Sequence, residues 1–197
     1  MCDINTLNEF KEKIVTLVKG SEYKDKVKPG MDPRIYLIDK NFYDQLSTSN
    51  DLEKLIRNFF EMGYFGMTVK YSEYEDYRVS SPKLKLYERD ILIFKYKDTR
   101  DDQILSILTH ELMHSLFPGI DITINTPECT SDERCGYNEA CTDYLAEIFY
   151  NRITQAPGNY FTQYMQKLDE KGEKMEAYRK FKGNEEIQSQ KLREYLG

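Results

Sequence analysis

The hydrophobic positions near the start of the chain repeat at helical spacing and predict two amphipathic helices. The first spans residues 6–20 and opens on a Thr-x-x-Glu capping pattern. The second spans residues 50–63 and opens on an Asn-x-x-Glu pattern. Both helices end at a glycine, as helices commonly do. Their apolar positions, first helix then second, are Phe10, Ile14, Leu17, Val18, Leu52, Leu55, Ile56, Phe59 and Phe60.

In the middle of the chain the pattern changes to short β-type segments. A strand is predicted at Arg34–Asp39, and others at Thr68–Tyr71, Lys83–Tyr87 and Ile91–Tyr96, all rich in β-branched or aromatic residues. The segment at Lys83–Tyr87 alternates between polar and apolar residues, which predicts a half-exposed strand. The segment at Ile91–Tyr96 begins with a continuous apolar run, which predicts a buried strand. Together these segments predict a small mixed sheet.

A helix predicted from Thr99 to Phe117 separates its apolar residues from its two histidines. His110 and His114 are four residues apart and therefore lie on one face, with Glu111 between that face and the apolar one. We expect the apolar stripe to anchor the helix and the histidines to face a cleft. The stripe consists of Leu105, Leu108, Leu112 and Leu116.

Residues 118–135 are predicted to form a long loop, which in a compact domain suggests a role in substrate binding. A strong helix then follows from Tyr137 to about Arg152, with Gly136 before it. An acidic stripe of this helix lies opposite its apolar stripe. The acidic residues are Glu139, Asp143 and Glu147, and the apolar ones are Tyr137, Cys141, Tyr144, Leu145, Ile148 and Phe149. Residues 159–197 are predicted to be helical with a charged, solvated surface.

These elements predict an α+β fold in one compact unit. The N-terminal lobe, residues 1–117, would hold the small mixed sheet and several helices, including the helix with the two histidines. The C-terminal lobe, residues 118–197, would be mainly helical. A chain of 197 residues is long enough for a substantial core.

The composition and net charge of the chain argue against some classes of binding partner. The chain is 40% hydrophobic and 31% charged, which is typical of a folded protein. Its formal charge of −6 argues against nucleic acid as a partner, because phosphate binding needs a basic surface. No apolar run approaches the length of about 20 residues that a membrane span needs. No secretion signal opens the sequence, so we expect a cytoplasmic protein, or a secreted or delivered one if a signal was removed.

The four cysteines favour reduced thiols in a cytosolic protein. Cys129, Cys135 and Cys141 are each separated by five residues, a spacing too wide for the usual C-x2-C zinc site. A disulfide or a redox-sensitive thiol near a metal stays an alternative. The fourth cysteine, Cys2, lies far away in the sequence.

The chemistry suggested by the sequence centres on the segment His110-Glu111-Leu112-Met113-His114. It matches H-E-x-x-H, the pattern that places two zinc ligands and a general base on one helix, and it contains the chain's two histidines. An ordinary amphipathic helix with two histidines is the alternative. A catalytic zinc takes three protein ligands and leaves one position open for water. With no further histidine, the third ligand must be a carboxylate or a thiolate.

A carboxylate is the better candidate, since two histidines and one glutamate form an established hydrolytic ligand set. Glu139 is favoured because it begins the acidic stripe of a helix whose other face is buried. Asp143 lies one turn further on, where it can accept a hydrogen bond from the outer nitrogen of a ligating imidazole.

Together, His110–His114 and Asn138–Asp143 resemble the gluzincin metallopeptidases, the thermolysin-like class, whose pattern is HExxH followed by N-E-x-x-[ST]-D. The resemblance extends from the motif helix through Glu147. It implies Zn²⁺ bound by His110, His114 and Glu139, with Glu111 as general base. It also implies that Asn138 and Asp143 support the ligands from behind, and that the substrate is a protein or peptide. The same resemblance implies a zincin-like fold, with the active-site cleft between the N-terminal and C-terminal lobes.

Two features depart from the gluzincin pattern. The gap between the two motifs is somewhat longer than in thermolysin, and the late histidine that stabilises the oxyanion there has no counterpart here. A tyrosine would have to take that role, and Tyr137 and Tyr144 are the candidates. Gluzincin substrates bind along an edge strand that precedes the histidine helix, a position that Lys83–Tyr87 or Ile91–Tyr96 could occupy.

The sequence therefore predicts a zinc metalloendopeptidase that hydrolyses peptide bonds with a zinc-activated water and Glu111 as general base. One alternative is a regulatory protease that cleaves a cytoplasmic repressor, because Glu139–Glu147 partly resembles a helix of short phage-type peptidases. The other is a non-catalytic binding or scaffold protein with a structural zinc, to which Cys129 or Cys135 would add a fourth ligand.

Overall fold

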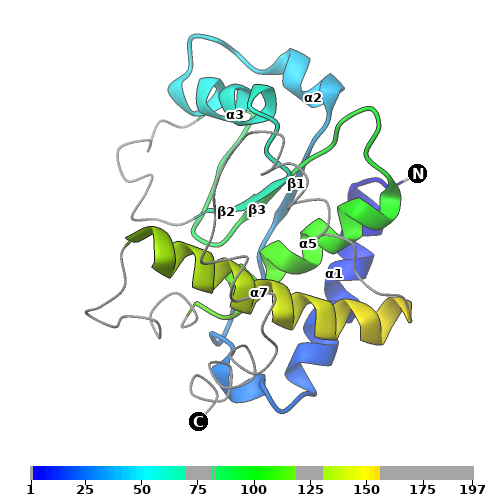
Figure 1. Ribbon diagram of the computed structural model, residues 1–197. Coiled ribbons are helices and arrows are strands. Elements are labelled where there is room, and N and C mark those ends of the chain that lie inside the picture. The colour runs from blue at the N-terminus through cyan, green and yellow to red at the C-terminus, as the bar shows by residue number, and fades with distance from the viewer. Residues whose placement is uncertain (1, 70–80, 82, 119–130, 156–197) are drawn as a thin grey trace.

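The computed structural model describes residues 2–69, 81, 83–118 and 131–155, with only the backbone described at 131–137 and 140. These residues form a mixed α+β structure with one small three-stranded sheet (Figure 1). In chain order the elements are α1 (Ile4–Lys19), a 3-10 turn η1 (Lys24–Lys26), β1 (Ile35–Ile38), α2 (Lys40–Gln45), α3 (Asp51–Glu61), β2 (Gly66–Thr68), β3 (Ile91–Phe94), α5 (Asp101–Leu116) and α7 (Ser131–Thr154).

The sheet has the strand order β1-β3-β2, so β3 is the middle strand and β2 lies at an edge. Strand β1 pairs with β3 in parallel, with Ile35 opposite Ile91. Strand β2 pairs with β3 antiparallel, with Gly66 opposite Ile93. The predicted small mixed sheet is thus confirmed for the described part of the chain.

The continuous apolar run of β3 is explained by helices on both faces of the sheet. Because successive side chains of a strand point to opposite faces, Ile91 and Ile93 enter one core and Leu92 and Phe94 the other. The first core also contains residues of α1, α5 and α7, and the second contains residues of α3. Figure 1 shows the corresponding layers, with α2 and α3 on one side of the strands and α1, α5 and α7 on the other.

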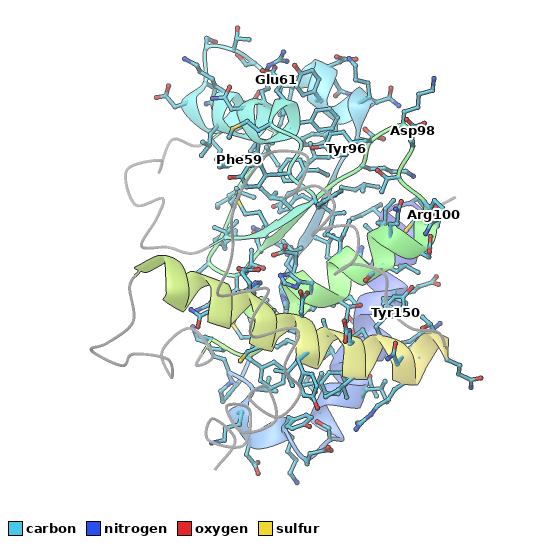
Figure 2. All side chains as sticks on the ribbon, viewed as in Figure 1. Phe59, Glu61, Tyr96, Asp98, Arg100 and Tyr150 are labelled. Carbon is cyan, nitrogen blue, oxygen red and sulfur yellow. The ribbon has the colours of Figure 1, made fainter. Side chains whose placement is uncertain are left out.

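Helix α5 is buried along most of its length. Every residue from Ser106 to Leu116 is buried, because the helix lies between the sheet and α7. The far end of α7 is attached through Tyr150, which is labelled in Figure 2. Its ring centroid lies 6.1 Å from that of Phe10 on α1, and its hydroxyl donates to the Asp102 main-chain oxygen at 3.3 Å. Helix α7 is thereby held against both α1 and α5. The division into two lobes at residue 117 and the cleft between them stay predictions.

The starts of two helices differ from the predicted ones. Helix α1 begins before Thr6, because the Asp3 side chain accepts a hydrogen bond from the Thr6 amide at 2.9 Å and is the N-cap. Helix α5 has Arg100 at its N-cap, and the Gln103 side chain accepts from the Arg100 amide at 2.7 Å. Thr99, predicted to open this helix, instead accepts from the Tyr96 amide. The predicted Gly20 C-cap and Asn50 N-cap are confirmed.

The predicted strand at Lys83–Tyr87 is wrong, because this segment is not a strand and pairs with none of the strands in the described part of the chain. Leu84 is buried and Lys85 exposed, so the alternation of burial holds without a β-ladder. The Lys85 main-chain oxygen accepts hydrogen bonds from the side chains of Arg34, just before β1, and Tyr36 in β1. Two other strands shift in extent: β2 starts two residues before the predicted Thr68, and β3 ends at Phe94 instead of Tyr96.

Helix α7 begins at Ser131, so the predicted loop is wrong at residues 131–135. Gly136 lies inside the helix instead of before it. A glycine within a helix costs only about 1 kcal/mol relative to alanine, too little to stop a helix that packs along its length. The remainder of the predicted loop, residues 119–130, and the predicted C-terminal helical region, residues 159–197, lie outside the described residues.

The buried side chain of Glu53 on α3 is expected to contribute to the stability of the fold. This buried carboxylate accepts hydrogen bonds from the Ser47 amide at 2.6 Å and from the Ser81 hydroxyl. Burial by itself raises the pKa of Glu53, but these two donors outweigh it and hold the pKa below the usual range. We therefore expect Glu53→Gln to lower the free energy of unfolding at neutral pH by about 1–2 kcal/mol.

The pH dependence of that loss follows from the sign of the pKa shift. Because the folded pKa lies below the unfolded one, the contribution of Glu53 is complete above the unfolded pKa and is lost as pH falls through the folded pKa. Urea unfolding at neutral and acidic pH measures this, with Glu61→Gln at the exposed end of the same helix as control. The prediction would be contradicted if the difference in free energy of unfolding between wild type and Glu53→Gln became larger at acidic pH.

Candidate metal centre

Two elements bring three metal-ligating side chains together. His110 and His114 lie one turn apart on α5, and Glu139 lies on α7, which packs against α5. The two histidine Nε2 atoms are 3.1 Å apart. Glu139 Oε2 lies 3.1 Å from His110 Nε2, and Glu139 Oε1 lies 3.3 Å from His114 Nε2. The structure thus brings together the three residues that the sequence predicted as ligands.

These separations suit one tetrahedral metal ion. Ligand atoms about 2.0–2.1 Å from a zinc ion at tetrahedral angles are about 3.3 Å from one another. The side chains of His110 and His114 are 3% and 7% exposed, and that of Glu139 is 26% exposed, so Glu139 is the ligand nearest to solvent. The group of His110, His114 and Glu139 can therefore hold a metal ion.

The charges around the imidazoles favour a cation. Burial alone would lower the pKa of His110, but the carboxylates of Asp143 and Glu139 outweigh it and raise this pKa well above its usual range. Burial likewise would raise the pKa of Glu139, but His114 and His110 hold it well below its usual range. Two carboxylates thus stabilise positive charge at this point, whether a proton or a metal ion carries it.

The outer nitrogens of both histidines have partners on α7. Asp143 Oδ1 lies 2.6 Å from His110 Nδ1, and Thr142 Oγ1 lies 3.4 Å from His114 Nδ1. The Thr142 hydroxyl donates to the Asn138 main-chain oxygen at 2.8 Å, so it can accept from His114 Nδ1–H. Both Nδ1 atoms then carry the proton, and both Nε2 lone pairs point to the centre.

The predicted place of Asp143 behind His110 agrees with this geometry, whereas no role was predicted for Thr142. The signal available for Thr142 is its position three residues after Glu139, which places it on the same side of α7. Asn138 contributes its main-chain oxygen to this network. Its side-chain oxygen, Oδ1, is buried and has no hydrogen-bond partner among the residues that the structure describes.

Glu111 lies beside the two histidines, but its carboxylate is held by the sheet. Thr68 Oγ1 on β2 lies 2.8 Å from Glu111 Oε2 and 2.9 Å from the Glu111 main-chain oxygen. Burial raises the pKa of Glu111, although the nearby histidines lower it in part. The carboxylate is thus close to the metal centre without belonging to the group of ligands. Thr68 is 43 residues away in sequence, and no local pattern identifies it.

Other candidates lie partly or wholly outside what the structure tests. Tyr144 is partly buried and packs against the core formed by α1, α5 and α7, as its place on the apolar stripe suggests. The side chain of Tyr137 lies outside the described part. The oxyanion roles of both tyrosines stay predictions. Cys2 and Cys141 are buried, whereas the side chains of Cys129 and Cys135 lie outside the described part.

The candidate segments for an edge strand need correction. Ile91–Phe94 cannot serve as an edge, because β3 is paired on both sides. Lys83–Tyr87 forms no strand at all. The edge strand of the described sheet that packs against α5 is β2, Gly66–Thr68.

Comparisons with known proteins found no match among family models, curated proteins or solved structures. Among the helices of the described residues, none combines the length and apolar character needed to cross a membrane.

Proposed function

We propose that this protein is a zinc-dependent metallopeptidase of the gluzincin type. The observation that carries the proposal is the convergence of His110 Nε2, His114 Nε2 and the Glu139 carboxylate at separations of 3.1–3.3 Å. Two imidazoles and one carboxylate form a ligand set of hydrolytic zinc enzymes, and they leave a fourth position open. The placement of Glu111 next to this centre adds a group for proton transfer.

The arrangement of elements also supports a zincin-like fold. An antiparallel edge strand, β2, packs against the helix that carries the histidines, and a later helix, α7, supplies the glutamate. Both ligands of α5 have hydrogen-bond partners on α7, so one helix supplies the third ligand and orients the other two. This agrees with the resemblance to gluzincins on residues 110–147.

The chemistry expected of the site divides between the ion and the chain. A bound zinc ion lowers the pKa of a coordinated water to about 7 and polarises a carbonyl oxygen. Glu111 accepts a proton from the water as its oxygen attacks the peptide carbon. Glu111 then delivers this proton to the amide nitrogen as the C–N bond breaks. The raised pKa of Glu111 suits both steps, because proton transfer is most efficient when the pKa lies near the working pH.

The substrate class is an extended segment of a protein or peptide. The Phe65 main-chain oxygen accepts a hydrogen bond from the Phe94 amide of β3 at 2.9 Å. The Val69 amide donates to the main-chain oxygen of Asp90, just before β3, at 2.8 Å. The alternate residues Gly66 and Thr68 therefore direct their main-chain groups away from β3. A substrate that pairs with these groups would add a strand to the sheet beside Glu111.

Removal of the metal tests the proposal. We expect the zinc-loaded protein to cleave members of a mixed peptide library, dialysis against a zinc chelator to abolish cleavage, and added zinc to restore it. Circular dichroism of the dialysed protein serves as the control for folding. Cleavage that persists after the zinc has been removed, or a fully zinc-loaded protein that cleaves no peptide, would overturn the proposed function.

A further inference from the structure

Strand β2 contacts Glu111 through two residues that are not metal ligands. Gly66 and Thr68 are two positions apart, so they face the same side of the sheet, and this side packs against α5. Thr68 touches one oxygen of the Glu111 carboxylate and Gly66 lies beside the other. The carboxylate is therefore placed by a strand that comes from a distant part of the sequence.

Thr68 holds Oε2 of the Glu111 carboxylate. Its side chain is buried and its Oγ1 lies 2.8 Å from Oε2 and 2.9 Å from the Glu111 main-chain oxygen. Both of these oxygens accept hydrogen bonds, and the hydroxyl of Thr68 is a donor. Thr68 therefore ties both the carboxylate and the helix backbone at Glu111 to strand β2.

Gly66 lets strand β2 approach the Glu111 side chain closely. A Cβ at this position would lie 2.8 Å from Oε1 and Cγ of Glu111 and 2.8 Å from Cγ2 of Ile107. Such contacts are too short, so any larger residue would displace Glu111, Ile107 or the strand. The lack of a side chain at Gly66 therefore allows the carboxylate its observed position.

We propose that Thr68 and Gly66 are positioning residues for Glu111, with Thr68 holding Oε2 and Gly66 allowing the carboxylate its place against the strand. This inference rests on the proposed function, because Glu111 needs a defined orientation only if it transfers a proton. Strand β2 would then have two roles: it would pair with the substrate and orient Glu111.

Three variants separate positioning from a purely structural contact. Thr68→Val keeps the shape but removes the hydroxyl, Thr68→Ser keeps the hydroxyl, and Gly66→Ala places a methyl group where the Glu111 side chain lies. We expect Thr68→Val and Gly66→Ala to lower kcat by about 10–100-fold, the range found when groups behind an active-site residue are removed, with KM changed by less than about threefold. Thr68→Ser should keep kcat within about threefold of wild type. All three variants should bind the same amount of zinc.

A second readout does not depend on peptide cleavage. Cobalt(II) in place of zinc has visible absorption bands that respond to groups around the ion. We expect Glu111→Gln to change these bands, Thr68→Val to change them in the same direction, and Thr68→Ser to leave them as in wild type. A Thr68→Val variant with wild-type kcat and wild-type bands would overturn the inference, as would a Thr68→Ser variant as impaired as Thr68→Val.

The two proposals fail in different ways. If the cobalt-loaded and zinc-loaded wild type cleaves no peptide, the proposed function is wrong, whereas the cobalt spectra still show whether Thr68 positions Glu111. If wild type cleaves peptides but the three variants behave alike, the function stands and the positioning role is wrong. Thermal unfolding of each variant identifies a loss of kcat that comes from a loss of folding.

Discussion

Replacing Glu111 with glutamine is expected to reduce peptide cleavage by about 10²–10⁴-fold while the protein keeps its zinc. Glutamine has nearly the shape of glutamate and can still accept the hydrogen bond from Thr68. It cannot take a proton from water, however, so the loss falls on the proton transfer. Because Glu111 is not among the three converging ligands, the metal content should not change.

This prediction is measured by kcat/KM on a cleaved peptide and by zinc content from plasma mass spectrometry. Glu61→Gln is a suitable control, because it is the same substitution on an exposed side chain of α3, a helix on the other face of the sheet. The control should keep wild-type activity. Glu111→Gln with unchanged activity would remove the general base from the mechanism, and loss of zinc in this variant would make Glu111 a ligand.

Glu139→Ala is expected to weaken zinc binding by more than about 100-fold, beyond the range typical of groups that only support a ligand. Glu139 is the sole carboxylate among the three converging residues, and it contacts both imidazoles. Without it, two neutral histidines would have to hold a divalent ion alone. Peptide cleavage should be lost together with the metal.

Competition with a chromophoric zinc chelator measures this affinity. Glu147→Ala, two turns further along α7, is the matched control and should bind zinc as tightly as wild type. Unchanged zinc affinity in Glu139→Ala would move the third ligand to another residue, such as a cysteine, and would favour the structural zinc site.

Much of the metal centre could be predicted because it depends on helix geometry. The spacing of four residues between His110 and His114 places their rings together on any α-helix. Glu139 and Asp143 have the same spacing, so one face of α7 can supply a ligand and a hydrogen-bond partner together. The spacing of these residues along each helix was therefore enough to predict which side chains share a face. The packing of α7 against α5 brings the two faces into contact.

The parts that could not be predicted depend on contacts between distant residues. Thr68 reaches Glu111 only because β2 pairs antiparallel with β3 at the sheet edge, and no local pattern encodes that pairing. The segment Lys83–Tyr87 has the alternation of a strand, yet its backbone accepts hydrogen bonds from the side chains of Arg34 and Tyr36. Alternation reports burial on one side, not the presence of a pairing partner.

X-ray absorption spectroscopy of the zinc-loaded protein tests the metal centre most directly, because it identifies the atoms bound to the ion. The proposed site predicts nitrogen and oxygen neighbours only, at about 2.0–2.2 Å, with two imidazoles, one carboxylate and one exchangeable oxygen. A sulfur neighbour at about 2.3 Å would contradict it, since a thiolate would close the fourth position and leave a structural site in place of a catalytic one.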